Sequence, residues 1–276
     1  MKTYKADQDD QVDAVAAEVL EALCTRRPVE PFSRRHPTVN IEPYAVTAAL
    51  RRRLEASGER IVGRKIGFTN RTMWAEYGVY APIWGYMRAS SVHDLADVSG
   101  RFSLAPFVEP RIEPEIVFQL RRAPEAGMTD RALAECIEWF GHGFEIVQSV
   151  YPSWSFTGFD TIAANGLHGA LLMGERLAVR GREAELASTL VNFDVNLLRS
   201  GTSMDRGNAR NVLDGPLSTL SHLAALLQDD QFNPPLSSGE IVSTGTLTRA
   251  LPVQAGETWS TILTGIQLDG IAVTFT

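Results

Sequence analysis

The stretch from residue 111 to 118, RIEPEIVF, constrains the fold more than any other part of the sequence. Its apolar residues are typical of a buried strand, yet Glu113 and Glu115 stand two positions apart within it. Because side chains at i and i+2 of a strand point to the same side, both carboxylates are expected on one face. Pro114 cannot donate to a ladder, so we expect this strand at a sheet edge or at a bulge.

The rest of the chain divides into a helical first quarter and a strand-rich remainder. Apolar residues at helical spacing predict helices over 9–25 and 43–56, and a proline-rich loop over 27–40 separates them. Residues 259–275 predict a terminal hairpin that turns at Asp269-Gly270. Between these ends, short apolar runs predict strands, interrupted by a few helices. The expected strands are 60–68, 111–120, 142–149, 168–173, 189–199 and 239–244, and the expected helices are 70–77, 129–140 and 216–229.

This pattern indicates the α+β class, with a large mixed or antiparallel β core. We expect a helical N-terminal region (1–60) that packs on a β-rich catalytic domain (61–276). The sequence shows no internal repeat and no long linker that would divide the chain further.

Composition excludes some classes of partner. The chain has 276 residues, is 44% hydrophobic and 21% charged, and carries a net charge of −7. Nucleic acid and anionic membranes both require a basic surface, so neither is expected as a partner. Two cysteines without a pairing motif, an N-terminus without an apolar signal core and the absence of a membrane-length apolar stretch predict a cytoplasmic protein.

Two carboxylates on one partly desolvated face repel each other, so another charge has to offset them. Arg111 could pair with one of them, or Mg²⁺ could bind both, because hard divalent cations take oxygen ligands. A solvated strand face with an ion pair is the simpler interpretation of this pattern alone. Glu145, in the apolar run FEIVQ, offers a third carboxylate from a separate predicted strand. Three such ligands would complete one face of an octahedral site.

Several basic side chains are further candidates. Lys65, between two glycines in GRKIG, could neutralise a substrate carboxylate or could be a surface lysine. His142 and His168 flank the region of Glu145, and either could transfer a proton near neutral pH or serve a structural role. Arg249 could meet a distal carboxylate of a diacid, or could lie on the surface.

Five segments in order resemble a known family: GRKIGFTN (63–70), GVYAPIWGYM (78–87), RIEPEIVFQL (111–120), FEIVQSVYPSWSFTGFDTIAAN (144–165) and GEIVSTGTLTRALPVQAGE (239–257). From about residue 43 onward the chain resembles the 2-keto-4-pentenoate hydratase and 4-oxalocrotonate decarboxylase branch of the fumarylacetoacetate hydrolase superfamily. The resemblance implies a β-roll core and a homo-oligomer built from dimers. It also implies a Mg²⁺ or Mn²⁺ site and a substrate site whose residues are Glu113, Glu115 and Glu145 for the metal, Lys65 for catalysis, and Thr244 and Gly245 for substrate binding.

The implied activity is that of a divalent-metal-dependent lyase acting on small 2-oxo acids through a metal-stabilised enolate. A hydratase of the 2-hydroxydienoate (2-keto-4-pentenoate) type is the leading expectation. The alternatives are a 4-oxalocrotonate-type decarboxylase, an acylpyruvate-type carbon–carbon hydrolase, and a non-catalytic metal-binding homologue. The sequence departs from the hydratase pattern at Ile83, which stands where hydratases of this branch carry an acid, and this favours the decarboxylase. Val150 and Ala164 likewise replace a family arginine and a family acid.

Overall fold

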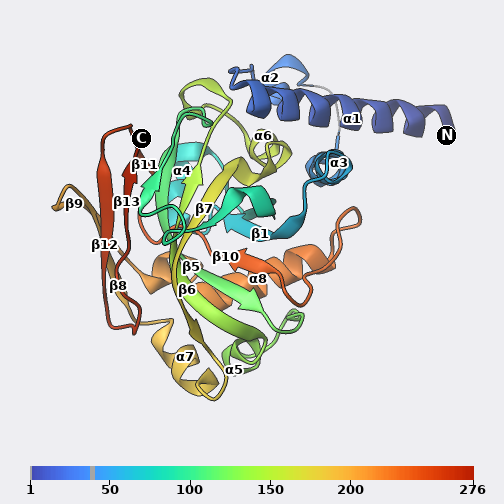
Figure 1. The fold of residues 1–276 in the computed structure, drawn as a ribbon. Helices are drawn as coiled ribbons and strands as arrows, with labels where there is room; N and C mark the ends of the chain where they lie inside the picture. Colours follow the sequence, from blue (N-terminus) through green and yellow to red (C-terminus); the bar gives the residue numbers. More distant parts are fainter. Residues whose placement is uncertain (1, 38–40) are drawn as a thin grey trace.

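The computed structural model describes residues 2–37 and 41–276 (Figure 1). The α-helices are α1 (Lys2–Thr25), α2 (Phe32–Arg35), α3 (Pro43–Ala56), α4 (Trp74–Tyr77), α5 (Asp130–Ala134), α6 (Gly158–Ala163), α7 (Glu183–Thr189) and α8 (Pro216–Gln228). The strands are β1 (Ile61–Gly67), β2 (Ile83–Arg88), β3 (Val92–Asp94), β4 (Arg101–Phe102), β5 (Arg111–Leu120), β6 (Ile137–Val147), β7 (His168–Ala178), β8 (Asp194–Arg199), β9 (Thr202–Asn208), β10 (Ile241–Ser243), β11 (Leu251–Pro252), β12 (Thr258–Thr264) and β13 (Ala272–Phe275). None of the helices in these described ranges has the length and apolarity needed to cross a bilayer.

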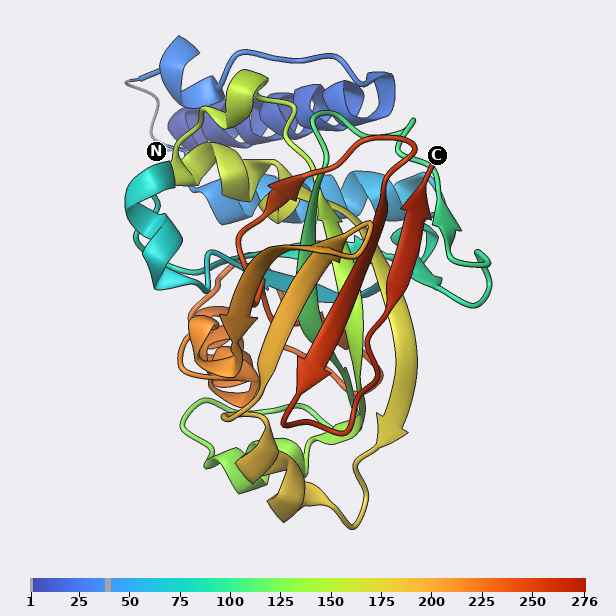
Figure 2. The same ribbon diagram turned by 90° about the vertical axis from the view of Figure 1, so that its left-hand side faces the viewer.

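The strands form two mixed sheets. The larger has the order β2-β1-β10-β5-β6-β7-β3, and β11 also pairs with β5. The smaller has the order β4-β13-β12-β8-β9 and faces the viewer in Figure 2. Most neighbours are antiparallel, but β1–β10, β3–β7 and β4–β13 are parallel. This architecture confirms the predicted α+β class with a mixed β-roll core.

One face of the larger sheet supplies most of the core. Near the start of β5, Ile112 packs with Phe144 of β6 against Trp259 and Phe275 of the smaller sheet, and all four side chains are buried. Farther along the same strand, Phe118 belongs to a second cluster with the leucines of α8. The face of β5 with even-numbered residues is therefore fully apolar, and chemistry can lie only on its other face.

The N-terminal helices α1 and α3 lie above the ends of the sheets in Figure 2. They bury a separate apolar cluster that includes Val19, Leu50, Tyr151 and Leu167. The first strand begins at Ile61, next to the expected boundary at residue 60. The division into two regions remains a proposal.

The structure corrects several predicted boundaries. α1 begins at Lys2 instead of residue 9, and α2 lies inside the predicted loop 27–40, of which residues 38–40 are outside the described part. The predicted helix 129–140 ends at Ala134, because the aromatic run that follows belongs to β6. The predicted strand 189–199 begins only at Asp194, after α7.

The terminal hairpin is confirmed, because β12 and β13 pair antiparallel, but its predicted turn is wrong. The connection spans residues 265–271, and Asp269-Gly270 lies late in it rather than at a two-residue turn. Gly265 takes the left-handed conformation at φ 86°, which starts the reversal.

The expectation that Pro114 marks an edge or bulge is also wrong, because β5 lies inside the larger sheet between β6 and two shorter strands. On that second side, β11 pairs with β5 up to Ile112 and β10 pairs from Val117 onward. The Pro114 carbonyl accepts from Leu247 N in the gap between them. Its nitrogen faces the same gap, so the missing donor breaks no ladder bond.

We predict that Gly85→Ala destabilises the fold by about 1–3 kcal/mol or more, because overpacking a tight contact costs that much. A Cβ at this position would lie 2.2 Å from the Asn165 carbonyl oxygen. The Asn165 side chain bonds to Tyr86 N and Tyr86 O at 2.7 and 2.8 Å, so the backbones cannot separate without losing both bonds. Urea unfolding measures the loss. Gly158→Ala, where no atom lies within 4 Å, is the control, and equal stabilities of the two variants would contradict the prediction.

Candidate metal centre and active site

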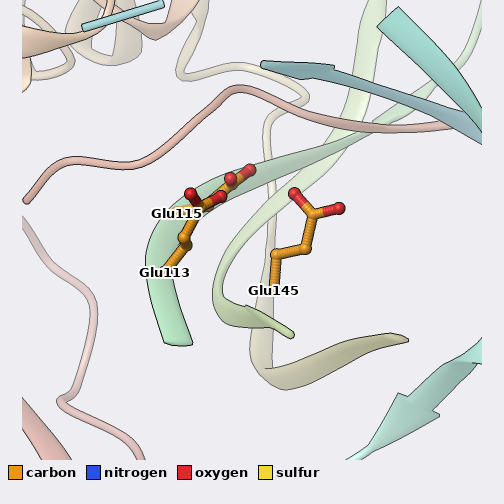
Figure 3. Close-up of side chains that lie close together, drawn as sticks. All are labelled: Glu113, Glu115 and Glu145. Carbon is orange, nitrogen blue, oxygen red and sulfur yellow. The ribbon is translucent and has the colours of Figure 1, made fainter. Parts of the chain in front are cut away.

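The register of β5 and β6 brings the three predicted carboxylates together. Glu113 pairs directly with Glu145, and Glu115 pairs with Gly143 two positions along. All three side chains therefore project from the same face of the sheet, as Figure 3 shows. One carboxylate oxygen from each lies within 4.8 Å of the other two. The structure thus brings together the residues that the sequence predicted to share an ion.

Lys65 of β1 lies on the same face of the sheet, because it pairs with Ser243 of β10, which in turn pairs with Val117 of β5. Its Nζ lies 3.1 Å from Glu145 Oε2, and both side chains are at most 3% exposed. Burial acts to lower the pKa of Lys65, but the nearby carboxylates, Glu145 foremost, outweigh it and raise the pKa to about 12. Lys65 is therefore a buried ammonium at neutral pH.

The three carboxylates have different proton affinities. Burial, reinforced by the charge of Glu145, raises the pKa of Glu115 well above its ordinary value. Burial likewise raises the pKa of Glu113 to about 7, although Lys65 opposes it. For Glu145, burial would also raise the pKa, but Lys65 and the hydrogen bond from His168 lower it to about 2. Without a further positive charge, the cluster resists carrying three negative charges.

The carboxylate oxygens of the cluster fit a divalent cation. Glu115 Oε2 accepts from the Gly245 N–H at 2.9 Å, while its buried Oε1 accepts no hydrogen bond. Glu145 Oε1 is bonded to His168, while its buried Oε2 lies 3.1 Å from the Lys65 ammonium. Buried acceptors without donors are costly, and a hard cation such as Mg²⁺ or Mn²⁺ satisfies carboxylate oxygens in this geometry. The residues present therefore fit the metal that the resemblance implied.

The two candidate histidines lie on opposite faces of the sheet. His168, at the start of β7, places Nδ1 2.8 Å from Glu145 Oε1. His142 pairs with Ile116 and so points to the apolar face, where it bonds to Glu115 O and Thr261 Oγ1 at 2.9 Å each. Burial lowers its pKa to about 4. His142 therefore points away from the carboxylate cluster, and its position favours a structural role over the catalytic one considered from the sequence.

The turn after β10 contributes backbone rather than side chains. Gly245 has φ 87°, and a Cβ there would lie 1.9 Å from Thr69 Oγ1, so only glycine brings this N–H to Glu115. The Thr244 hydroxyl donates to Ile116 O at 2.9 Å and supports the turn. Arg249 does not reach the carboxylates, because its side chain is 58% exposed and pairs with Asp205 at 3.1 Å. The predicted substrate contact of Arg249 is not supported.

A cavity of about 50 Å³ opens onto this cluster. Lys65 and Glu113 are its charged lining residues, and most of its remaining wall is apolar or aromatic. The lining also includes Gly67, Phe68, Thr69, Asn70, Met73, Tyr77, Val147, Trp154, Gly166, Leu167, Thr246 and Ala250. Together these residues define a small site that could hold an anionic head at one end and a hydrocarbon tail at the other.

Sequence reasoning missed Thr69. Its side chain lines the cavity, and its buried Oγ1 has no hydrogen-bond partner among the described residues. Such an atom is suited to a ligand oxygen. The signal was available, since Thr69 belongs to the GRKIGFTN segment, in which only the lysine was singled out.

Fold and site together define a carboxylate cluster that could hold a metal ion, on a fumarylacetoacetate hydrolase-type β-roll. The fold is that of the 4-oxalocrotonate decarboxylase from Pseudomonas putida G7, complexed with magnesium and adipate, with TM-score 0.83, 23% identity and coverage of 97% of this chain and 98% of that one. A fumarylpyruvate hydrolase from Pseudomonas aeruginosa, in complex with Mn²⁺ and pyruvate, is more distant, with TM-score 0.53, 14% identity and coverage of 79% and 89%.

Sequence comparison places the chain more narrowly. It is 30% identical to a 2-keto-4-pentenoate hydratase of Paraburkholderia phymatum over 268 residues, which cover 94% of this chain and 95% of that one. It is 29% identical to a 2-hydroxyhexa-2,4-dienoate hydratase of Comamonas testosteroni over 266 residues, which cover 95% and 97%. No family model matches the chain. The chain belongs to the 2-keto-4-pentenoate hydratase family, whose members here are lyase-type enzymes.

We predict that Glu113→Gln stabilises the metal-free chain increasingly as the pH rises. The pKa of Glu113 is about 7 in the fold against an ordinary value of 4.5, so between these values the folded state binds the extra proton. Its contribution to stability is therefore lost as pH rises through this window. The gain over the parent chain should reach on the order of 1–3 kcal/mol at pH 8, since one pKa unit corresponds to about 1.4 kcal/mol.

Urea unfolding in EDTA at pH 5 and pH 8 measures this difference. The exposed Glu138 of β6 offers a matched control, and Glu138→Gln should show no such trend. A Glu113→Gln gain that is the same at both pH values would contradict the assignment.

Proposed function

We propose that this chain is a divalent-metal-dependent lyase acting on small 2-oxo acids, with hydration of 2-hydroxydienoates (the 2-keto-4-pentenoate type) as its reaction. One observation carries the proposal. Three carboxylates from β5 and β6 and a buried ammonium from β1 converge beside a cavity that Glu113 and Lys65 line, in a chain of the hydratase family. A non-catalytic metal-binding homologue has no need of the buried lysine or of the cavity.

Glu113, Glu115 and Glu145 would hold Mg²⁺ or Mn²⁺ through one carboxylate oxygen each. The bound cation supplies Lewis acidity toward the carboxylate and 2-oxo oxygens of the substrate and so favours the enolate form. Gly245 keeps Glu115 in place through its N–H, and its own position depends on contact with Thr69. The role of the three glutamates is therefore to offer fixed negative charge in a site from which most water is excluded.

Lys65 is the residue that we assign to substrate charge and proton transfer. Its ammonium lines the cavity beside the carboxylates, and it stays protonated at neutral pH because of them. It can bind the substrate carboxylate, and it can donate a proton to the carbon chain where the dienol becomes a ketone. Thr69 Oγ1 adds a buried hydroxyl at the same end.

The apolar lining residues of the cavity support the hydratase over the decarboxylase. Phe68, Met73 and Leu167 line it, and Lys65 is the sole cation among the described lining residues. A second carboxylate placed there would be buried without a partner, which is costly. A monocarboxylate with a short unsaturated tail avoids this cost.

Assembly from dimers and a cytoplasmic location stay predictions of the sequence analysis.

The test supplies the chain with Mg²⁺ and either 2-hydroxypenta-2,4-dienoate or 2-hydroxyhexa-2,4-dienoate. Consumption of the substrate is measured as the loss of dienoate absorbance. We predict that Glu113→Ala lowers turnover by at least about 100-fold, because losing a ligand costs no less than losing its supporting partner. The same variant should weaken metal binding without unfolding the chain, since like-charge repulsion is relieved. Glu138→Ala is the control, and full activity in Glu113→Ala would refute the site.

One observation favours the 4-oxalocrotonate-type decarboxylase as a second candidate. Arg111, two residues before Glu113, donates to the Tyr77 hydroxyl at 2.6 Å, and its guanidinium carbon lies 4.0 Å from the Trp154 ring centroid. Tyr77 and Trp154 both line the cavity, so this guanidinium lies at its rim. In the described part of the chain it makes no ion pair, and it could receive the distal carboxylate of a diacid.

A paired assay separates the two candidates. We predict that the parent chain hydrates 2-hydroxyhexa-2,4-dienoate and releases no carbon dioxide from 4-oxalocrotonate. Arg111→Gln should then leave the kcat/KM for the dienoate within about threefold, because a rim contact outside the lining is worth little. Release of carbon dioxide by the parent chain, reduced about 10-fold or more in Arg111→Gln, would replace the hydratase with the decarboxylase.

A further inference from the structure

His168 contacts Glu145, a metal ligand of the proposed function, from outside the lining of the cavity. Its Nδ1 lies 2.8 Å from Glu145 Oε1, and the two side chains are 1% and 0% exposed. His168 is absent from the cavity lining, although its neighbours Gly166 and Leu167 belong to it. Any effect of this imidazole on the chemistry therefore passes through Glu145.

The second ring nitrogen is also held. His168 Nε2 lies 2.9 Å from Ser91 Oγ, and this oxygen in turn accepts from Arg88 N at 3.1 Å. A carboxylate oxygen can only accept, so the imidazole hydrogen facing Glu145 is on Nδ1. The ring is thus fixed at both ends, by a carboxylate on one side and by a hydroxyl anchored to the backbone on the other.

The fold places this chain of contacts with some strain. Ser91 directly precedes β3, which runs parallel to β7 and brings the hydroxyl beside His168. The register between β6 and β7 shifts between Ile146 and Val147, opposite the start of β7. Before His168, Asn165 and Leu167 adopt left-handed conformations with φ 56° and 62°. Strained backbone of this kind persists only where the surroundings hold it, and it is common beside functional groups.

We propose that His168, braced by Ser91, is a positioning residue that holds Glu145 Oε1 so that only Oε2 faces Lys65 and the divalent cation. The inference rests on the metal site of the proposed function, but on no particular substrate or reaction. Oε2 is buried and lies 3.1 Å from Lys65 Nζ, which agrees with this division of roles.

The test measures Mn²⁺ affinity of the purified full chain by electron paramagnetic resonance. His168→Leu removes the contact and should weaken Mn²⁺ binding about 10–100-fold, the usual cost of losing the partner of a ligand. His168→Asn can place its amide nitrogen near the position of Nδ1, so its affinity should stay within about threefold of the parent chain. His168→Gln places its amide nitrogen near the position of Nε2 instead, so it should weaken Mn²⁺ binding as His168→Leu does. Ser91→Ala should weaken binding less than His168→Leu does.

Two results would overturn the proposal. One is a His168→Leu variant that melts at a lower temperature yet binds Mn²⁺ with the parent affinity, because His168 would then be purely structural. The other is a His168→Asn variant with parent Mn²⁺ affinity but a lost kcat, because the imidazole would then transfer a proton itself. His93→Leu, at a half-buried histidine of β3, controls for the loss of a histidine and should leave Mn²⁺ affinity unchanged.

The proposed function can fail separately. If no dienoate or diacid is turned over but the His168 series follows the predicted order of Mn²⁺ affinity, the positioning role stands and the reaction is wrong. If the parent chain turns over a dienoate with Mg²⁺ but the His168 series binds Mn²⁺ equally, the positioning role is wrong and the function stands.

Discussion

The rest of the site depends on an imbalance of buried charge. Three carboxylates lie within 4.8 Å of one another, and a single ammonium, Lys65, is paired with them. If all ionise, three negative charges and one positive leave a net charge of −2, which one divalent cation would cancel. In the absence of that cation, burial and the neighbouring negative charge of Glu145 raise the pKa values of Glu113 and Glu115. The cluster therefore keeps protons.

The strands of the β-roll position these charged groups beside one another. The β5–β6 register sets Glu113 opposite Glu145, β1 delivers Lys65, and the turn after β10 delivers the Gly245 N–H. The opposite face of the same strands is packed with large apolar side chains such as Phe118 and Phe144. That packing offsets the cost of a polar face that does not stabilise the fold, as functional sites commonly require.

Strand periodicity alone predicted that Glu113 and Glu115 share a face. Local sequence context made Glu145 and Lys65 candidates, and the resemblance assigned them to the same site. The same periodicity could have removed His142, because it lies three residues before Glu145 on one strand and so points the other way. The contact of His168 could not be predicted, since it depends on the shifted register between β6 and β7. Pro114 misled for a similar reason, because a gap between β10 and β11 is visible only in three dimensions. The local sequence pattern thus predicted which face of a strand a residue occupies. Long-range strand pairing determined which residues come into contact.

The most direct measurement is anomalous diffraction from a crystal grown with Mn²⁺. We predict one strong peak enclosed by Glu113, Glu115 and Glu145, with carboxylate oxygens at about 2.0–2.3 Å, the range for small divalent cations and oxygen ligands. Lys65 should remain beside Glu145 without binding the ion. A crystal in saturating Mn²⁺ with no peak at these carboxylates, or with its peak elsewhere, would contradict the central claim.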